Sequence, residues 1–110
     1  MRILIAEDDF ASRKFMLKFL SKFGECDITV DGMEAVDAYL MALDADTPYD
    51  LVCLDIMMPA LDGYQALKAI RDIEQERKIP EDQRAKIIVF TNTFVIGGKV
   101  KDDFSPLQCE

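Results

Sequence analysis

The sequence predicts an α/β fold built on a doubly wound parallel sheet. Short apolar segments of strand length alternate with longer segments whose apolar residues recur at helical spacing. The segment at residues 51–54 is apolar at every position, as in a strand covered on both faces. Such alternation implies right-handed crossovers between parallel strands. Without repeats or linkers, the pattern predicts a single domain over residues 1–110.

The first half of the chain predicts two strands around a helix. Residues 2–6 (RILIA) have the length and composition of a strand, and residues 26–30 alternate in strand period. Between them, residues 10–23 predict a helix that ends at Gly24. Its apolar face is expected to contain Phe10, Met16, Leu17, Leu20 and Phe23.

The second half repeats this pattern twice. Asp31 with Glu34, and Asp62 with Gln65, have the spacing of a capping box and predict the starts of two helices. Strands are predicted at residues 50–55 and 86–91. The inward faces of the two helices are expected to contain Val36, Tyr39, Leu40, Leu43, Leu67, Ile70 and Ile73. Glu74 and Lys78 are predicted to lie on the outer side of the second helix.

Composition narrows the function. The net charge of −8 disfavours direct binding to nucleic acid or anionic lipid, and no apolar run approaches the length of a membrane span. The chain has no histidine, and its three cysteines lack metal-ligand spacing, which makes a zinc site improbable. We interpret Cys26 and Cys53 as small buried residues, and we expect a cytoplasmic location.

Polar residues follow three of the predicted strands at their carboxyl ends, where functional residues gather in such sheets. The first strand leads to Glu7 and Asp8, the third to Asp55 and the fourth to Thr91. If the first and third strands are neighbours, these carboxylates crowd together and favour Mg²⁺ as a hard counter-ion. Two other interpretations remain open: residues 7–9 could be a solvated loop in which Asp9 caps the helix, and Asp55 could be a turn residue.

Three motifs, ILIAEDD, LVCLDIMMPALDGY and KIIVFTN, resemble the receiver domains of two-component response regulators. The resemblance runs from Arg2 to about Asn92. It implies a flavodoxin-like topology with strand order 2-1-3-4. It also implies that Asp55 is the phosphoacceptor and that Thr91 donates its hydroxyl to the bound phosphoryl group.

The resemblance further implies a Mg²⁺ site formed by Glu7, Asp8, Asp55 and the backbone carbonyl of Met57. The expected partners are a histidine kinase or phosphotransfer protein and a downstream protein target. Such a domain assists its own phosphorylation and dephosphorylation and is not a turnover enzyme. Asn92 stands where the family usually has a small residue, so we expect it to tune the lifetime of the phosphoryl group.

The chain departs from the family after about residue 95. The usual Lys-Pro pair is absent, and residues 99–104 (KVKDDF) predict a fourth helix, leaving no fifth strand or fifth helix. Residues 86–90 would then form an exposed sheet edge, so we expect either self-association through the fourth strand or a truncated form. An alternative function is a degenerate receiver that binds partners without phosphate. A Mg²⁺-dependent phosphatase is disfavoured, because Met57 occupies the place of its second catalytic Asp.

Overall fold

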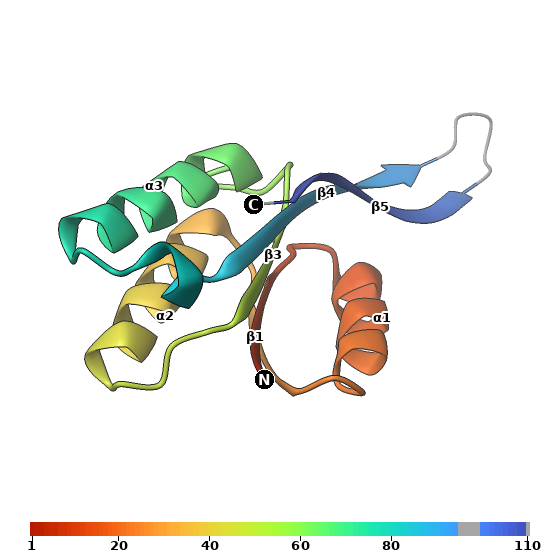
Figure 1. The fold of residues 1–110 in the computed structure, drawn as a ribbon. Coiled ribbons are helices and arrows are strands. Elements are labelled where there is room, and N and C mark those ends of the chain that lie inside the picture. Colours follow the sequence, from red (N-terminus) through yellow and green to blue (C-terminus); the bar gives the residue numbers. More distant parts are fainter. Residues whose placement is uncertain (95–99, 110) are drawn as a thin grey trace.

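The computed structural model describes residues 1–94 and 100–109, and the side chains of residues 1–91. It has a five-stranded sheet in the order β2-β1-β3-β4-β5, with the first four strands parallel (Figure 1). The strands are β1 (Arg2–Ala6), β2 (Glu25–Thr29), β3 (Leu51–Asp55), β4 (Lys86–Phe94) and β5 (Val100–Cys109). The predicted order 2-1-3-4 of the parallel strands is confirmed.

Three helices cover the sheet: α1 (Phe10–Leu20), α2 (Gly32–Asp44) and α3 (Gly63–Glu76), followed by a 3₁₀ turn, η1 (Glu81–Gln83). Helix α1 lies on one side of the sheet, and α2 and α3 lie on the other (Figure 1). An aspartate caps the first turn of each helix: Asp9, Asp31 and Asp62. Within the described part of the chain, no helix is long and apolar enough to span a bilayer.

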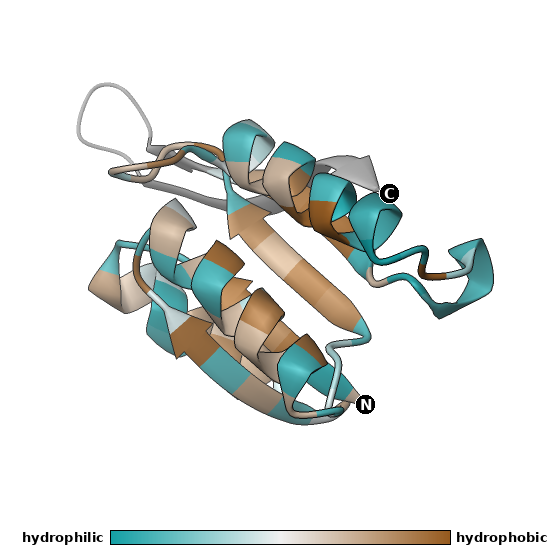
Figure 2. Ribbon diagram, turned by 90° about the vertical axis from the view of Figure 1, so that its left-hand side faces the viewer, coloured by the Kyte–Doolittle hydropathy of each residue, from teal (hydrophilic) through white to brown (hydrophobic). Residues whose placement is uncertain are grey.

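Each face of the sheet has its own hydrophobic core. The strand at the centre of Figure 2 is coloured as hydrophobic. Beneath α2 and α3, the core includes the buried Tyr39, Leu54 and Ile70. Beneath α1, it includes Met16 and Leu20. The predicted inward placement of Phe10 and Phe23 is wrong: both are exposed, since Phe10 opens the helix and Phe23 follows its end.

Helix α3 contains a second departure from the sequence-based expectation, because Glu74 is fully buried and does not lie on its outer side. The Glu74 carboxylate accepts hydrogen bonds from the Tyr39 hydroxyl (2.5 Å), the Ala85 backbone N–H (3.0 Å) and the Arg71 guanidinium (2.6 Å). These bonds satisfy a charge that would otherwise be costly to bury. They also join α2, α3 and the start of β4.

The end of the chain differs most from the prediction. Residues 100–109 form β5, antiparallel to β4, where a helix was predicted at 99–104 and no fifth strand at all. β4 is therefore an inner strand, and the predicted exposed β4 edge is wrong. Self-association, which was expected from that edge, stays a prediction. The physical reason is that β5 pairs with the backbone groups of β4 that would otherwise face solvent, and antiparallel pairing needs only a short connection. Residues 95–99 lie outside the described part of the structure.

Candidate functional site

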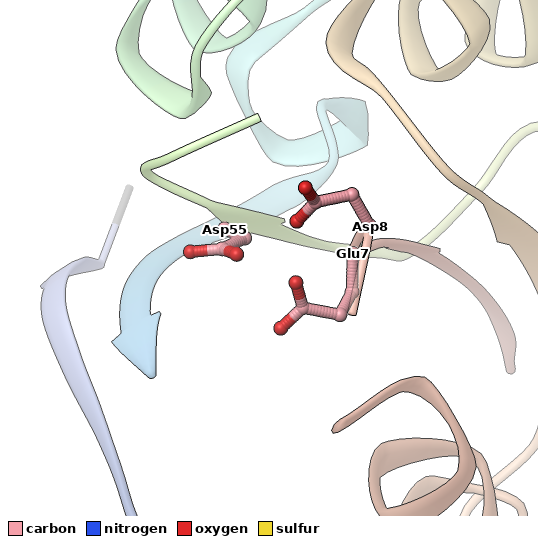
Figure 3. Close-up of side chains that lie close together, drawn as sticks. All are labelled: Glu7, Asp8 and Asp55. Carbon is pink, nitrogen blue, oxygen red and sulfur yellow. The ribbon is translucent and has the colours of Figure 1, made fainter. Parts of the chain in front are cut away.

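The register of β1 and β3 places three carboxylates together. Ala6 pairs with Leu54 across these neighbouring parallel strands, so Glu7 and Asp55 emerge side by side at the same edge of the sheet. Asp8 follows Glu7 and points toward the same space (Figure 3). One carboxylate oxygen from each of the three residues lies within 4.8 Å of the others.

The three carboxyl groups differ in burial. Glu7 is fully buried and Asp55 is 5% exposed, whereas Asp8 is exposed to solvent. Burial raises the pKa of Glu7 to about 9, reinforced by the hydrogen bond that the protonated Glu7 carboxyl donates to the Asp55 carboxylate and by the negative charge of Asp55. Burial also raises the pKa of Asp55, and the charge of Asp8 acts in the same direction. The cluster therefore holds less negative charge at neutral pH than three free carboxylates would.

Backbone contacts fix the segment after β1. The backbone N–H of Glu7 donates to the Thr29 carbonyl (3.1 Å), which extends the pairing with β2 by one residue. The Arg13 guanidinium donates to the carbonyl oxygens of Glu7 (3.2 Å) and Asp8 (2.9 Å). Arg13, in the first turn of α1, thus fixes the backbone of both acidic residues.

Asp9 has a different role from the two acids before it. Its carboxylate accepts hydrogen bonds from the backbone N–H (2.9 Å) and the hydroxyl (2.8 Å) of Ser12, and these bonds lower its pKa. Asp9 is the N-cap of α1, as one of the two open interpretations predicted. That interpretation holds for Asp9 alone, because Glu7 and Asp8 lie in the carboxylate cluster.

The loop after β3 is shaped around Asp55. The backbone N–H of Met57 donates to Oδ1 of Asp55 (3.3 Å), and that of Gly63 donates to the Ile56 carbonyl (2.9 Å). A Cβ atom at residue 63 would lie only 2.5 Å from the Asp55 carbonyl oxygen, so the close approach requires glycine. The capping box of Asp62 and Gln65 then starts α3 at a fixed position.

This loop and Asp8 border an open hollow beside the cluster. Its lining consists of Asp8, Ile56, Met57, Met58, Pro59 and Asp62. Met57 is 75% exposed, and its backbone N–H contacts Asp55. The role of its carbonyl as a metal ligand stays a prediction.

The predicted switch residue Thr91 lies within β4 and does not end it, because the strand extends to Phe94. Phe90 pairs with Asp55 in the sheet, so Thr91 lies one residue beyond that pair toward the carboxylate edge. Thr91 is half-buried, and its backbone pairs with Ser105 of β5. Its predicted hydroxyl contact with a phosphoryl group stays a prediction. The Asn92 side chain lies outside the described part of the structure.

The donor set of the cluster fits a hard divalent cation. Glu7, Asp8 and Asp55 offer carboxylate oxygens close enough to bind one ion. Glu7 and Asp55 are both buried, so a cation would relieve the repulsion between their charges. Mg²⁺ prefers such oxygen ligands and retains several water ligands, for which the exposed side of the cluster leaves room. These three residues can therefore hold Mg²⁺.

Two comparisons of sequence show which known proteins the chain resembles. The family model described as the response regulator receiver domain matches residues 3–94. Hybrid signal transduction histidine kinase I of Dictyostelium discoideum is 36% identical over 102 residues, covering 91% of the chain and 6% of the kinase. Two-component response regulator 24 of Arabidopsis thaliana is 35% identical over 77 residues, covering 69% of the chain and 52% of that protein. The chain thus spans a small part of the kinase and about half of the plant regulator.

Solved structures agree in fold. The receiver domain of the histidine kinase CKI1 from Arabidopsis thaliana, complexed with Mg²⁺ and BeF₃⁻, superposes with a TM-score of 0.71 at 27% identity, covering 87% of the chain and 68% of that domain. The receiver domain of Ssk1 from Saccharomyces cerevisiae, crystallised with the histidine phosphotransfer protein Ypd1, gives a TM-score of 0.68 at 25% identity, covering 86% and 66%.

Proposed function

Because this chain belongs to the response regulator receiver domain family of two-component phosphorelays, we propose that it accepts a phosphoryl group on Asp55 with Mg²⁺ as cofactor. The donor is a histidine kinase or a phosphotransfer protein, and the phosphorylated domain acts on a downstream protein target. One observation supports this proposal above others: the carboxylates of Glu7, Asp8 and Asp55 converge at the carboxyl ends of β1 and β3.

The proposed reaction is a phosphoryl transfer between two side chains. An oxygen of Asp55 attacks the phosphorus of a phosphohistidine, the new P–O bond forms as the P–N bond breaks, and the electron pair of that bond leaves with the imidazole nitrogen. The backbone N–H of Met57 holds Asp55 in one orientation for this attack. Thr91 donates its hydroxyl to the transferred group, which couples β4 to the phosphorylation state.

Glu7 and Asp8, with Asp55 and the backbone carbonyl of Met57, are the residues that would hold Mg²⁺. Bound there, the cation supplies positive charge that offsets the charge of these carboxylates and of the incoming phosphoryl oxygens. Burial raises the pKa of Asp55 in the metal-free domain, so the residue becomes a better nucleophile when its neighbours' charge is compensated. The free thiols of Cys26 and Cys53 support a reducing, cytoplasmic location.

A second candidate function is a receiver that binds partners without being phosphorylated. The two candidates differ in one measurable property, the uptake of a phosphoryl group.

The proposal is tested by incubating the chain with Mg²⁺ and acetyl phosphate and measuring its intact mass. We expect one added phosphoryl group, absent in Asp55→Asn and retained in the matched control Asp37→Asn, which alters an exposed aspartate of α2. Omission of Mg²⁺ should also abolish the uptake. No uptake by the wild-type chain would favour the non-phosphorylated module, and continuous phosphate release would favour a turnover phosphatase.

A further inference from the structure

Strand β2 forms an open edge of the sheet. It lies at the end of the strand order away from β5, and among the described strands only β1 pairs with it. The helices that precede and follow it in the chain, α1 and α2, leave this edge uncovered, since Thr29 alone of its five residues is buried. An open edge presents backbone groups that a further strand can bind.

The outward backbone groups of β2 belong to Cys26 and Ile28. The Glu25 N–H donates to the carbonyl of residue 1 (2.9 Å), and the Thr29 carbonyl accepts from the N–H of residue 7 (3.1 Å). Alternate residues of a parallel strand bond to the same neighbour, so residues 25, 27 and 29 face β1. Cys26 and Ile28 therefore turn their N–H and C=O groups toward the open edge.

The two faces of the sheet differ in chemistry at this edge. Cys26 and Ile28 pair with β1 residues of the core beneath α1, so their side chains lie on that face. Ile28 is 38% exposed there. Glu25 and Asp27 alternate with them and lie on the opposite face, where both are exposed. A strand added at this edge would meet an apolar side chain on one face and two carboxylates on the other.

The sequence around β2 is strongly acidic. Residues 23–67 contain ten acidic residues and no basic residue, in a chain whose net charge is −8. Arg2 of β1 offsets part of this charge, because its guanidinium lies 3.0 Å from Asp27 and 3.9 Å from Glu25. In the described part of the chain, three acidic residues between the end of β2 and the middle of α2 have no ion-pair partner: Asp31, Glu34 and Asp37. The β2 edge therefore favours a cationic partner.

We infer that the β2 edge binds an extended segment of another protein in which lysine or arginine alternates with apolar residues. The segment adds a strand beside β2, and its backbone bonds to the free groups of Cys26 and Ile28. Its apolar side chains lie beside Ile28, and its basic side chains lie beside Glu25 and Asp27. This inference goes beyond the proposed function and does not depend on phosphoryl transfer.

Charge disfavours two other occupants of the edge. If β2 of a second copy paired with it, the carboxylates of the two strands would face each other and repel. Nucleic acid and anionic lipid carry the same sign of charge as residues 23–67. A basic extended segment complements both the free backbone groups and the acidic side chains.

Synthetic peptides test the inference. The free edge ends at Val30, whose N–H donates to the Glu34 carboxylate (3.0 Å), so a peptide of about eight residues spans it. One peptide alternates valine with lysine, and the other alternates valine with glutamate. Binding is followed by fluorescence anisotropy in EDTA without a phosphodonor. We expect the lysine peptide to bind at least about tenfold more tightly, with an affinity that falls as salt is added.

Backbone methylation tests whether the lysine peptide binds as a strand. The N–H groups of alternate residues point to opposite edges of a strand, so two N-methylated versions of the lysine peptide separate these edges. We expect methylation of one alternate set to abolish binding, because it removes the donors that face β2. Methylation of the other set should leave the affinity within about twofold.

Hydrogen exchange locates the peptide on the chain. The Cys26 and Ile28 amides face solvent in the free protein, and saturating lysine peptide should slow their exchange by about tenfold or more. The Glu25 amide, which is already bonded to the carbonyl of residue 1, should change little and provides an internal reference.

Surface variants give an independent test. Glu25→Lys should weaken binding of the lysine peptide by about tenfold, whereas the matched charge reversal Glu76→Lys, on the exposed side of α3, should leave it unchanged. Ile28→Pro removes an outward donor, a change that edge strands tolerate, and should abolish binding. Circular dichroism melts check that each variant is folded.

The inference is overturned if the lysine and glutamate peptides bind equally or not at all. It is also overturned if both methylated peptides bind like the parent, if the Cys26 and Ile28 amides gain no protection, or if Glu76→Lys weakens binding as much as Glu25→Lys. Self-association that Ile28→Pro abolishes would assign the edge to a second copy instead. Because the phosphodonor is omitted, none of these results depends on whether Asp55 accepts a phosphoryl group.

Discussion

Glu7 and Asp55 end neighbouring parallel strands, and their buried carboxyl groups are hydrogen-bonded to each other. Two carboxylates cannot both remain ionised at such close range without a compensating charge. In the absence of a cation, the pair therefore holds a proton, with the pKa of Glu7 raised to about 9. Loss of this proton at high pH should therefore destabilise the metal-free domain.

The metal-free domain should lose stability as the pH rises. The unfolded chain loses the Glu7 proton near the ordinary pKa of 4.5, whereas the folded chain keeps it until about pH 9. The folded state binds more protons throughout this interval, so the free energy of unfolding falls as the pH increases. Thermal melts in EDTA at about pH 6 and about pH 8.5 measure the effect, and Glu7→Gln should flatten it. An equal or higher melting temperature at the higher pH in the wild-type chain would contradict this account.

Magnesium should stabilise the domain more strongly at high pH. Its carboxylate ligands must be deprotonated, so binding displaces the Glu7 proton, which costs less as the pH approaches the pKa of that group. The shift in melting temperature on adding Mg²⁺ should be larger at about pH 8.5 than at about pH 6.5. Asp8→Asn should reduce this shift, and the control Asp37→Asn should preserve it. A shift that is independent of both pH and Asp8 would place the ion elsewhere.

The buried Glu74 is predicted to be a structural anchor far from the site. Glu74→Ala would leave the Tyr39 hydroxyl, the Ala85 N–H and the Arg71 guanidinium without their acceptor. Removing one member of such a buried network costs about 2–4 kcal/mol of unfolding free energy. Glu76→Ala, on the exposed side of the same helix, should change it little. Urea denaturation of the two variants compares these costs, and similar values for both would show that the network contributes little.

Lys78 occupies a backbone conformation that favours glycine. Its φ angle is 55°, and it follows α3 in a Schellman motif, with hydrogen bonds from Lys78 N–H to the Gln75 carbonyl (3.1 Å) and from Ile79 N–H to the Glu74 carbonyl (3.0 Å). Lys78→Gly should therefore stabilise the domain by about 1 kcal/mol. Lys68→Gly, inside the same helix, should destabilise it by about the same amount. The two melting temperatures should move in opposite directions, and a loss of stability at residue 78 would refute the assignment.

Local patterns in the sequence predicted the parallel part of the fold because its strands and helices have clear periods and caps. The spacing of Asp31 to Glu34 and of Asp62 to Gln65 marked two helix starts, and both caps are present. The convergence of acids required one further step, the placement of β1 beside β3. The apolar run at residues 51–54 suggested a central strand, but it did not show which strands lie beside it.

The missed features depend on tertiary contacts. Glu74 looks like a solvent-facing charge at helical spacing. The hydrogen bonds from the Tyr39 hydroxyl and the Ala85 backbone N–H, both outside α3, offset the cost of burying it. β5 was missed because residues 99–104 have weak strand propensity and are stabilised by pairing with β4. The Gly97-Gly98 dipeptide in the sequence is a hairpin signal that could have predicted this pairing.

The most direct test of phosphoryl acceptance by Asp55 is chemical trapping of the phosphorylated residue. Borohydride reduces an aspartyl phosphate to homoserine, and peptide mass spectrometry then identifies the modified position. After treatment with acetyl phosphate and Mg²⁺, we predict homoserine at position 55 alone, and none when Mg²⁺ is withheld. Modification at Glu7 or Asp8, or no modification at any carboxylate, would contradict the account.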